Sequence, residues 1–295
     1  IDNTSDNQAP SSMVSFIWNQ YTVPSSGGGW SKSDWGAIRS CNYFLKEYQS
    51  VQGDAAVINA SVAEILFFKS FFYYNKVKQF GDVPWLSEVL QTDSEDLMNA
   101  RDSRKLVVDS IIKNLNFAVQ YLPDELSEDR LTKYAALAFK SRVCLFEGTY
   151  RKYHNLGDHE PMLREAVSSA EGVINSGKFS IYYTEHPSAD YYDLFSADEL
   201  RGNPEGIMVQ YYAYDKLMHN RNRILSEPQS GYTKDFVQSY LCKDGKPISV
   251  SPLYKGDAQF ADEFIDRDPR MKQAVYTPDR PILITSTGAE SFQPV

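Results

Sequence analysis

The sequence contains only three cysteines, and none has a paired spacing. Cys41, Cys144 and Cys242 are isolated from one another, and no CxxC motif occurs. A sparse and odd set of this kind predicts neither a disulfide framework nor a zinc site. Cys41 and Cys144 fall in segments with helical patterning, so we expect them to be buried free thiols.

Positive charge is also scarce, since 30 Lys and Arg stand against 39 Asp and Glu and the net charge is -9. Proteins that bind nucleic acid neutralise phosphates with basic patches, so we expect no nucleic-acid partner. The same acidity gives no electrostatic attraction to anionic lipid. No secretory signal is recognisable, and no uninterrupted apolar run reaches the roughly 18 residues that predict a membrane span.

Motifs that carry catalysis are missing as well. No Gly-x-Ser-x-Gly elbow occurs, and among the 39 acidic residues no pair stands out as the two carboxylates of a glycoside hydrolase. His154 and His159 lie near Asp158 and Glu160, but not at a standard ligand spacing, so we expect solvated loop residues rather than a metal site. The sequence predicts no enzyme, no cofactor and no metal.

Aromatic residues are abundant: 20 Tyr, 16 Phe and 4 Trp make up 14% of the chain. The segment 62–85, VAEILFFKSFFYYNKVKQFGDVPW, is apolar on every helical face, which is typical of a buried core helix. Gly81 is a candidate C-cap, and a helix cannot continue at Pro84. The complete pattern predicts helices over 35–48, 55–80, 103–122, 132–153 and 161–176.

These helices have short connections and many alanines, which favours stacked helix hairpins of the tetratricopeptide kind, although no clean 34-residue repeat is visible. From residue 178 onward Pro, Gly, Asp and Tyr become frequent. We therefore expect a mainly α fold, with a helical part over 33–177. The remaining parts, 1–32 and 178–295, are expected to be irregular, with short strands and helical turns.

Several segments resemble, in order, motifs of the SusD/RagB family, which are surface lipoproteins of Bacteroidetes nutrient-uptake systems. WGAIRSCNYFL and AEILFFKSFFYYNKVKQFGDVP resemble its first two helices, with Lys69 and Ser70 in place of the usual Arg-Ala. The other matching segments are ARDSRKLVVDSIIKNLNFAVQYLP (100–123), RLTKYAALAFKSRVCLFEG (130–148), NPEGIMVQ (203–210), DGKP (244–247) and FIDRDPRMKQAVYTPD (264–279).

The resemblance implies one tetratricopeptide-like superhelical domain over 1–295 with an irregular, ligand-binding lobe. It implies a non-catalytic protein that captures oligosaccharide or polysaccharide and delivers it to a SusC-like TonB-dependent transporter. Such proteins are lipid-anchored at the extracellular face of the outer membrane. The first cysteine here is Cys41, inside a helix motif, so we interpret the sequence as a fragment without the lipidated cysteine.

Two alternatives remain on the same scaffold. The ligand could be peptide or another nutrient, as the RagB side of the family suggests. The protein could also dock on its transporter without a ligand of its own.

Sugar binding needs aromatic rings for the apolar faces of the sugar and polar groups for its hydroxyls. Trp18, Tyr21 and Trp30 lie in a polar, loop-like N-terminal region and are the first candidates, with local packing as the alternative. The second candidate group is Tyr211, Tyr212, Tyr214, Asn220 and Arg221, following an expected strand. Structural roles are expected for Arg39, Asn42, Trp35, Trp85 and the charged turn Asp266, Arg267, Asp268 and Arg270.

Overall fold

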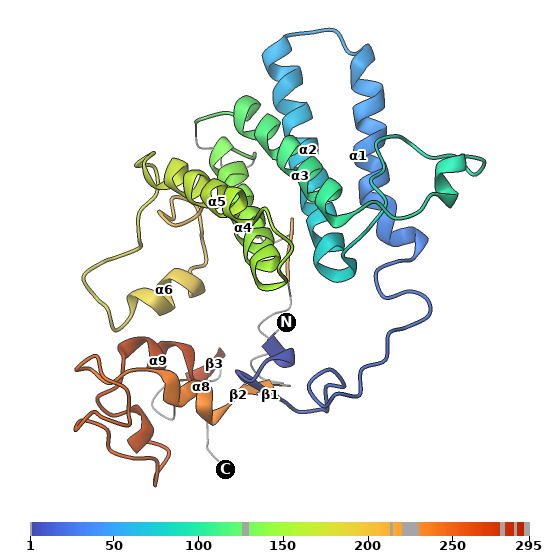
Figure 1. The fold of residues 1–295 in the computed structure, drawn as a ribbon. Coiled ribbons are helices and arrows are strands. Elements are labelled where there is room, and N and C mark those ends of the chain that lie inside the picture. Colours follow the sequence, from blue (N-terminus) through green and yellow to red (C-terminus); the bar gives the residue numbers. More distant parts are fainter. Residues whose placement is uncertain are drawn as a thin grey trace. The chain divides into compact units, whose positions relative to one another are not determined.

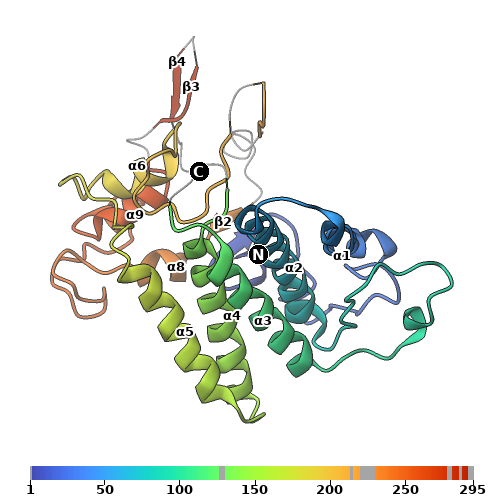
Figure 2. The same ribbon diagram turned by 90° about the horizontal axis from the view of Figure 1, so that it is seen from above.

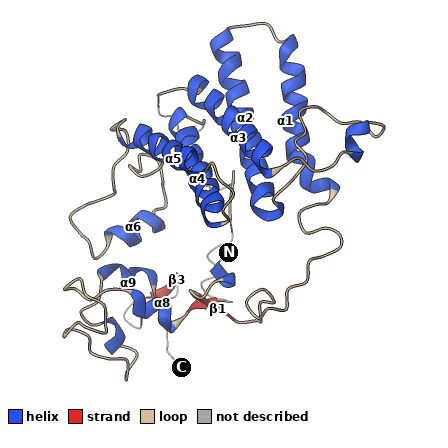
Figure 3. Ribbon diagram, viewed as in Figure 1, coloured by secondary structure: helices blue, strands red, loops and turns tan. Residues whose placement is uncertain are grey.

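The computed structural model describes residues 2–125, 130–212, 215–219, 230–277, 281–285 and 288–291. The chain forms two compact units. The helical unit comprises residues 24–180 and 204–209, and the mixed unit comprises 1–23, 181–203 and 210–295. Figure 1 colours the ribbon along the sequence, and Figure 3 colours it by secondary structure.

The described part of the helical unit contains five α-helices, and each packs against the next in the chain (Figures 1 and 2). They are α1 (Gly36–Glu47), α2 (Ala55–Phe80), α3 (Arg104–Tyr121), α4 (Lys133–Tyr153) and α5 (His159–Ile174). Short 3-10 helices lie at Lys32–Trp35, Tyr48–Ser50 and Glu95–Met98. The expectation of a mainly α fold with helix-hairpin packing is confirmed.

The start of the fifth helix differs from the expectation. The helix α5 begins at His159, two residues before Pro161, and ends at Ile174. Gly157 and Asp158 both have positive φ angles, 73° and 50°, so the chain reverses direction there and enters the helix early.

The helix α2 is the centre of the core. Phe67 and Tyr73 are almost fully buried, as are Ala63 and Val77, and they pack with apolar residues of α1, α3 and α4. By length and composition α2 is the one helix in the described residues that could cross a membrane, so the expectation of no such segment is corrected. Its buried lysine and its packing against α1 and α3 identify it as a core helix.

The FGDVPW turn after α2 is fixed by hydrogen bonds, as expected. Gly81, at φ 71°, donates its N–H to the Val77 carbonyl at 3.0 Å and ends the helix. Asp82 accepts the N–H of Arg104 at 2.7 Å and so satisfies a free donor at the start of α3. The buried Tyr73 hydroxyl accepts the Leu86 N–H at 2.7 Å. The turn therefore sets the position of α3 against α2.

Polar residues of α1 hold the segment that follows this turn. Arg39 donates to the Leu90 carbonyl at 3.0 Å, and Asn42 donates to the carbonyls of Leu86 and Glu88 at 3.0 and 2.9 Å. The structural roles expected for Arg39 and Asn42 are confirmed.

Lys69 completes this network from α2. Its ammonium donates to Asn42 Oδ1 at 2.6 Å and lies 5.0 Å from the centre of the Trp85 ring. The side chain is only 3% exposed, and no carboxylate is bonded to it among the described residues. Burial lowers the pKa of Lys69 to about 8.

We expect Lys69 to make the protein more stable as the pH rises from 8 toward 10.5. In the unfolded chain this lysine keeps its proton up to its ordinary pKa of 10.5, whereas in the folded protein it releases the proton near pH 8. Between these values the unfolded chain binds more protons, so the free energy of unfolding increases with pH. Burial of the protonated Lys69 therefore destabilises the fold. This destabilisation is fully present below pH 8 and amounts to about 3 kcal/mol at most.

Denaturant unfolding of the wild type and of Lys69→Met at both ends of this range measures the effect. The comparison with a variant is needed because burial also raises the pKa of the Cys41 and Cys144 thiols. These thiols make the free energy of unfolding decrease as the pH rises, which is opposite to the effect of Lys69. The stability of the wild type relative to Lys69→Met should rise by about 3 kcal/mol across the range. A difference independent of pH would contradict the buried charge.

The mixed unit has little regular structure. The antiparallel strands β1 (Gln8–Pro10) and β2 (Ser230–Tyr232) form one pair, and β3 (Pro281–Thr285) and β4 (Gly288–Ser291) form another. Its helices are α6 (Asp190–Ser196), α8 (Lys234–Ser239) and α9 (Pro269–Ala274), with 3-10 turns at Asp2–Thr4 and Asp262–Phe264. The strand expected before Tyr211 is wrong, because residues 203–210 contain turns and bends around Pro204 and Gly206 instead.

The charged turn 266–270 is structural, as expected. Arg267 is 3% exposed and pairs with Glu263 at 2.7 Å. Asp268 pairs with Arg270 at 2.6 Å, and Asp266 pairs with Lys243 at 3.2 Å. Each charge is therefore used within the fold.

Candidate functional site

The first candidate site is the Trp18 turn, residues 14–20 of the mixed unit. Gln20 donates its N–H to the Ser15 carbonyl at 2.8 Å, and Asn19 donates to the Phe16 carbonyl at 3.3 Å. Asn19 has φ 54°, the left-handed conformation that closes a helical turn in this bonding pattern. The backbone of the turn is thus defined by its own hydrogen bonds.

Large apolar side chains gather on the outside of this turn. Trp18 is 64% exposed and Tyr21 is 56% exposed. The other exposed large apolar side chains of residues 13–23 are Met13, Phe16, Ile17 and Val23. Phe16 and Tyr21 meet edge to face with ring centres 6.2 Å apart, whereas Trp18 has no ring partner among the described residues. A concentration of exposed rings of this kind makes the segment a candidate binding surface.

The segment before the turn is tied to the rest of the mixed unit. Gln8 of β1 pairs with Tyr232 of β2, and Thr233 donates its N–H to the Asn7 carbonyl at 3.0 Å. Ser230 donates its hydroxyl to Gln8 Oε1 at 2.8 Å. The Trp18 turn therefore begins four residues after a paired strand.

Trp30 lies in the helical unit and in a different environment. Its ring meets Trp35 and Phe80 edge to face, with centres 5.2 and 4.8 Å apart, and the Arg101 guanidinium lies 4.5 Å from its centre. The preceding glycines are held by α2, since Gln79 donates to the Gly28 carbonyl at 2.6 Å. Packing accounts for these contacts of Trp30, and its role in ligand binding stays a prediction.

The structural roles expected for the other two tryptophans are confirmed. Trp85 packs on Tyr73 with ring centres 4.2 Å apart. Trp35 packs on Trp30 and Tyr73 at the edge of the core.

The second predicted group is described only in part. Tyr211 lies beneath the Arg201 guanidinium at 5.5 Å, and Tyr212, which is half exposed, meets the His219 ring edge to face at 4.9 Å. The other members, Tyr214, Asn220 and Arg221, lie outside the described residues. The described part is a pair of aromatic–cation and aromatic–aromatic contacts within the mixed unit.

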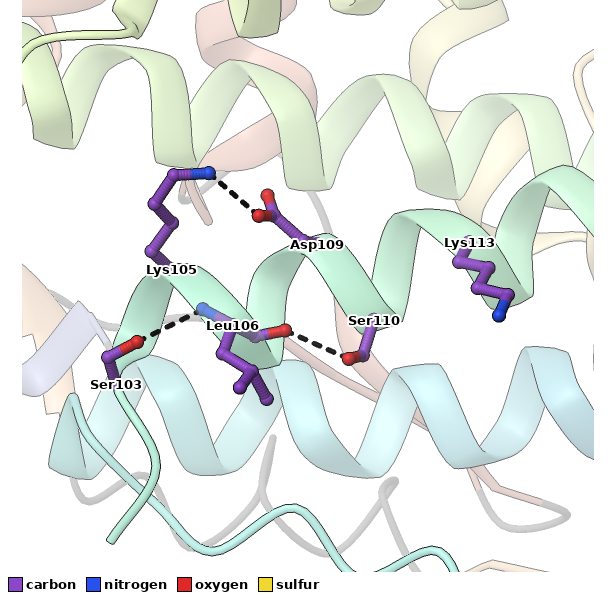
Figure 4. Close-up of a pocket in the computed structure, with 6 residues that line it drawn as sticks. All are labelled: Ser103, Lys105, Leu106, Asp109, Ser110 and Lys113. Carbon is purple, nitrogen blue, oxygen red and sulfur yellow. Dashed lines mark hydrogen bonds and ion pairs between the residues drawn. The ribbon is translucent and has the colours of Figure 1, made fainter.

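A shallow hollow on the exposed face of α3 is a different kind of surface (Figure 4). Lys105 pairs with Asp109 at 2.7 Å, and Ser110 donates its hydroxyl to the Leu106 carbonyl at 2.9 Å. The remaining lining residues are Ser103 and Lys113. The lining contains no aromatic ring, and most of its polar groups bond to one another, so it offers no platform for a sugar.

The histidines near α5 have local partners. The His154 ring lies against Tyr150 with centres 4.2 Å apart, and Glu160 pairs with Arg164 at 3.1 Å. In the part of the chain that the structure describes, no three His, Cys, Asp or Glu side chains come together as metal ligands.

Nearly half of the sequence is similar to a known family. Residues 2–145 match the SusD-like family model described as "Starch-binding associating with outer membrane". SusD-like protein P2 of Formosa agariphila is 26% identical over 230 residues, which are 77% of this chain and 37% of that protein. The chain therefore spans less than half of this relative.

Solved structures share the fold. A SusD-like protein of Bacteroides fragilis superposes with a TM-score of 0.76 at 22% identity, covering 99% of this chain and 59% of that one. A SusD-like carbohydrate-binding protein of the same species gives a TM-score of 0.66 at 20% identity, covering 92% of this chain and 52% of that one.

These matches agree with the mainly helical fold and with the motifs of the first two helices. The family model is described as starch-binding and the second structure as carbohydrate-binding, in agreement with the expectation that the protein is not an enzyme. The chain is therefore similar to the SusD-like family, in sequence over residues 2–145 and in its fold.

Proposed function

We propose that this chain is the ligand-capturing part of a surface glycan-binding protein. The observation that carries the proposal is the Trp18 turn, which presents exposed rings on a hydrogen-bonded backbone in a chain similar to the SusD-like family. The CH-rich faces of sugar rings pack on aromatic rings, and nearby hydroxyl and amide groups bond to sugar hydroxyls. Trp18 and Tyr21 supply the rings.

The complete protein would pass the captured oligosaccharide to a SusC-like TonB-dependent transporter. It would be held by a lipid anchor at the extracellular face of the outer membrane. The support is the family, whose model is described as associating with the outer membrane. Because the chain covers 37% of SusD-like protein P2, partner and anchor belong to the proposal for the whole protein.

Neutral glucans are the first ligands to try. Two structures with the same fold are described as a laminarin-binding SusD-like protein and as a complex with xylogluco-oligosaccharide, at 21% and 20% identity. The glycan panel therefore contains laminarin, xyloglucan, starch and mannan, with polygalacturonate as an acidic member.

Affinity electrophoresis of the chain through gels containing each glycan tests the proposal. We expect at least one neutral glycan to retard the chain, while a non-binding protein of similar charge migrates unchanged. Retardation by none of them, together with calorimetric binding of peptides, would contradict the proposal and favour the peptide-binding alternative.

A further inference from the structure

A second group of aromatic side chains lies in the mixed unit, on α6 and around α8. Tyr232 stacks on Phe236 with ring centres 4.7 Å apart, and Phe236 meets Tyr240 at 5.7 Å. Tyr232 ends β2, Phe236 lies in α8 and Tyr240 directly follows α8, so the three rings form a row from the strand across the helix. On α6, the ring centres of Tyr191 and Phe195 lie 5.0 Å apart. We call these five residues the α6–α8 aromatic face.

Three of these rings are open to solvent. Tyr191 is 43% exposed, Phe195 is 72% exposed and Tyr232 is 41% exposed. Phe236 and Tyr240 are half-buried. Each of the two groups thus combines exposed rings with ring-to-ring contacts, which differs from a scatter of single exposed residues.

Buried polar side chains hold the helices under this face. The Arg267 guanidinium donates to the carbonyls of Val237 and Tyr240 at 3.1 and 2.9 Å, which satisfies acceptors at the end of α8. Gln273 of α9 accepts the Tyr192 N–H at 2.9 Å and donates to the Pro187 carbonyl at 3.0 Å. These bonds fasten α8 to the 267 turn and α6 to α9, which lie side by side in Figures 1 and 2.

A charged pair borders the same rings. Arg270 donates to both carboxylate oxygens of Asp268, at 3.0 and 2.6 Å, and its side chain is 62% exposed. Burial raises the pKa of Tyr240, the neighbouring Tyr232 and Tyr191 raise it further, and Arg270 lowers it. Three tyrosine hydroxyls and one ion pair therefore lie within electrostatic reach of one another.

We propose that the α6–α8 aromatic face, with the Asp268–Arg270 pair at its edge, is a binding site for a neutral oligosaccharide. This site rests on the proposed function and is separate in sequence from the Trp18 turn. The rings offer stacking surface, and the tyrosine hydroxyls, the guanidinium and the carboxylate offer donors and acceptors for sugar hydroxyls.

Neutral sugar is favoured over acidic sugar by the state of the ion pair. Asp268 already occupies the Arg270 guanidinium in a two-point contact, which is the strong geometry for this pair. A uronate carboxylate would have to displace Asp268, whereas a sugar hydroxyl can accept from the exposed guanidinium of the intact pair.

Calorimetric titration of the chain with short oligosaccharides cut from the retarding glycan tests the site. The double variant Tyr191→Ala, Tyr232→Ala removes two rings, and Tyr183→Ala removes an exposed tyrosine of the same unit as the matched control. We expect the double variant to lose one class of oligosaccharide-binding sites, or to bind the oligosaccharide about tenfold more weakly. The control variant should bind it with the affinity of the wild type. Polygalacturonate fragments should not bind this face.

Arg270→Gln provides a second test if the double variant unfolds, because its side chain is largely exposed. It should weaken binding several-fold without moving the thermal midpoint. Glycan binding that is unchanged in the double variant and in Arg270→Gln would overturn this site and leave the proposed function standing. An absence of glycan binding by the wild type would overturn both.

Discussion

Glu147→Ala is expected to destabilise the protein by about 3–5 kcal/mol. Glu147 lies in α4 with its side chain 2% exposed, and it pairs with Arg104 and Arg151, both at 2.8 Å. Arg104 begins α3, donates to the Val77 carbonyl of α2 at 3.2 Å and lies 3.8 Å from the centre of the Tyr150 ring. One carboxylate therefore pairs with two guanidinium groups where three helices meet.

Removing this carboxylate leaves two largely buried cations without their partner, which costs more than the pair itself contributes. Chemical denaturation monitored by circular dichroism measures the loss. Glu160→Ala is the matched control, because its pair with Arg164 is about 70% exposed on both sides and is worth about 0–1 kcal/mol. If Glu147→Ala cost no more than Glu160→Ala, this account of the helical unit would be wrong.

Trp18→Ala is expected to weaken glycan binding by about 30-fold, which corresponds to the 2 kcal/mol of an aromatic binding hot spot. Trp18 is 64% exposed and has no ring partner among the described residues, so its removal should leave the free energy of unfolding nearly unchanged. Calorimetry with the retarding glycan, combined with denaturant unfolding, separates the two effects.

Trp30→Ala is the matched comparison and should lower stability. Its ring packs on Trp35 and Phe80, so we expect a loss of about 2 kcal/mol in stability, below the range for a fully buried tryptophan. The glycan affinity of the folded variant tests whether this ring also contacts the ligand. Equal loss of affinity in both variants would place Trp30 in the site as well, and intact binding in Trp18→Ala would remove Trp18 from it.

The helical unit could be predicted closely because its signals are local. The segment 55–80 is bounded by Asp54, which accepts the Ala56 N–H at 2.7 Å, and by Gly81. Ser103 caps α3 in the same way. The start of helix α5 was predicted two residues late, at Pro161, because proline is a good first-turn residue. The positive φ angle of Asp158, which precedes the true start, could not be recognised in the sequence.

The mixed unit could not be predicted in this detail because long-range bonds form it. The pairing of β1 with β2 joins residues more than 200 positions apart, and each strand has three residues, too few for a period-two pattern. Arg267 was expected to form a salt-bridge turn, but its bonds to the carbonyls at the end of α8 have no sequence signature.

The candidate sites show the same limit. Loop composition correctly suggested that Trp18 is exposed, yet the same reasoning could not distinguish it from Trp30, which packs. The α6–α8 aromatic face was missed, although the spacing of Tyr191 and Phe195 by four residues was a readable signal. The packing of α6 on α9 is a long-range contact, for which the sequence pattern carries no signal.

Calorimetric titration of the wild-type chain with the glycan panel is the decisive measurement for glycan capture. We expect saturable binding of at least one neutral glycan, weakened about 30-fold by Trp18→Ala at unchanged stability. Heats no larger than dilution for every glycan, from a chain shown to be folded by its cooperative unfolding, would contradict it.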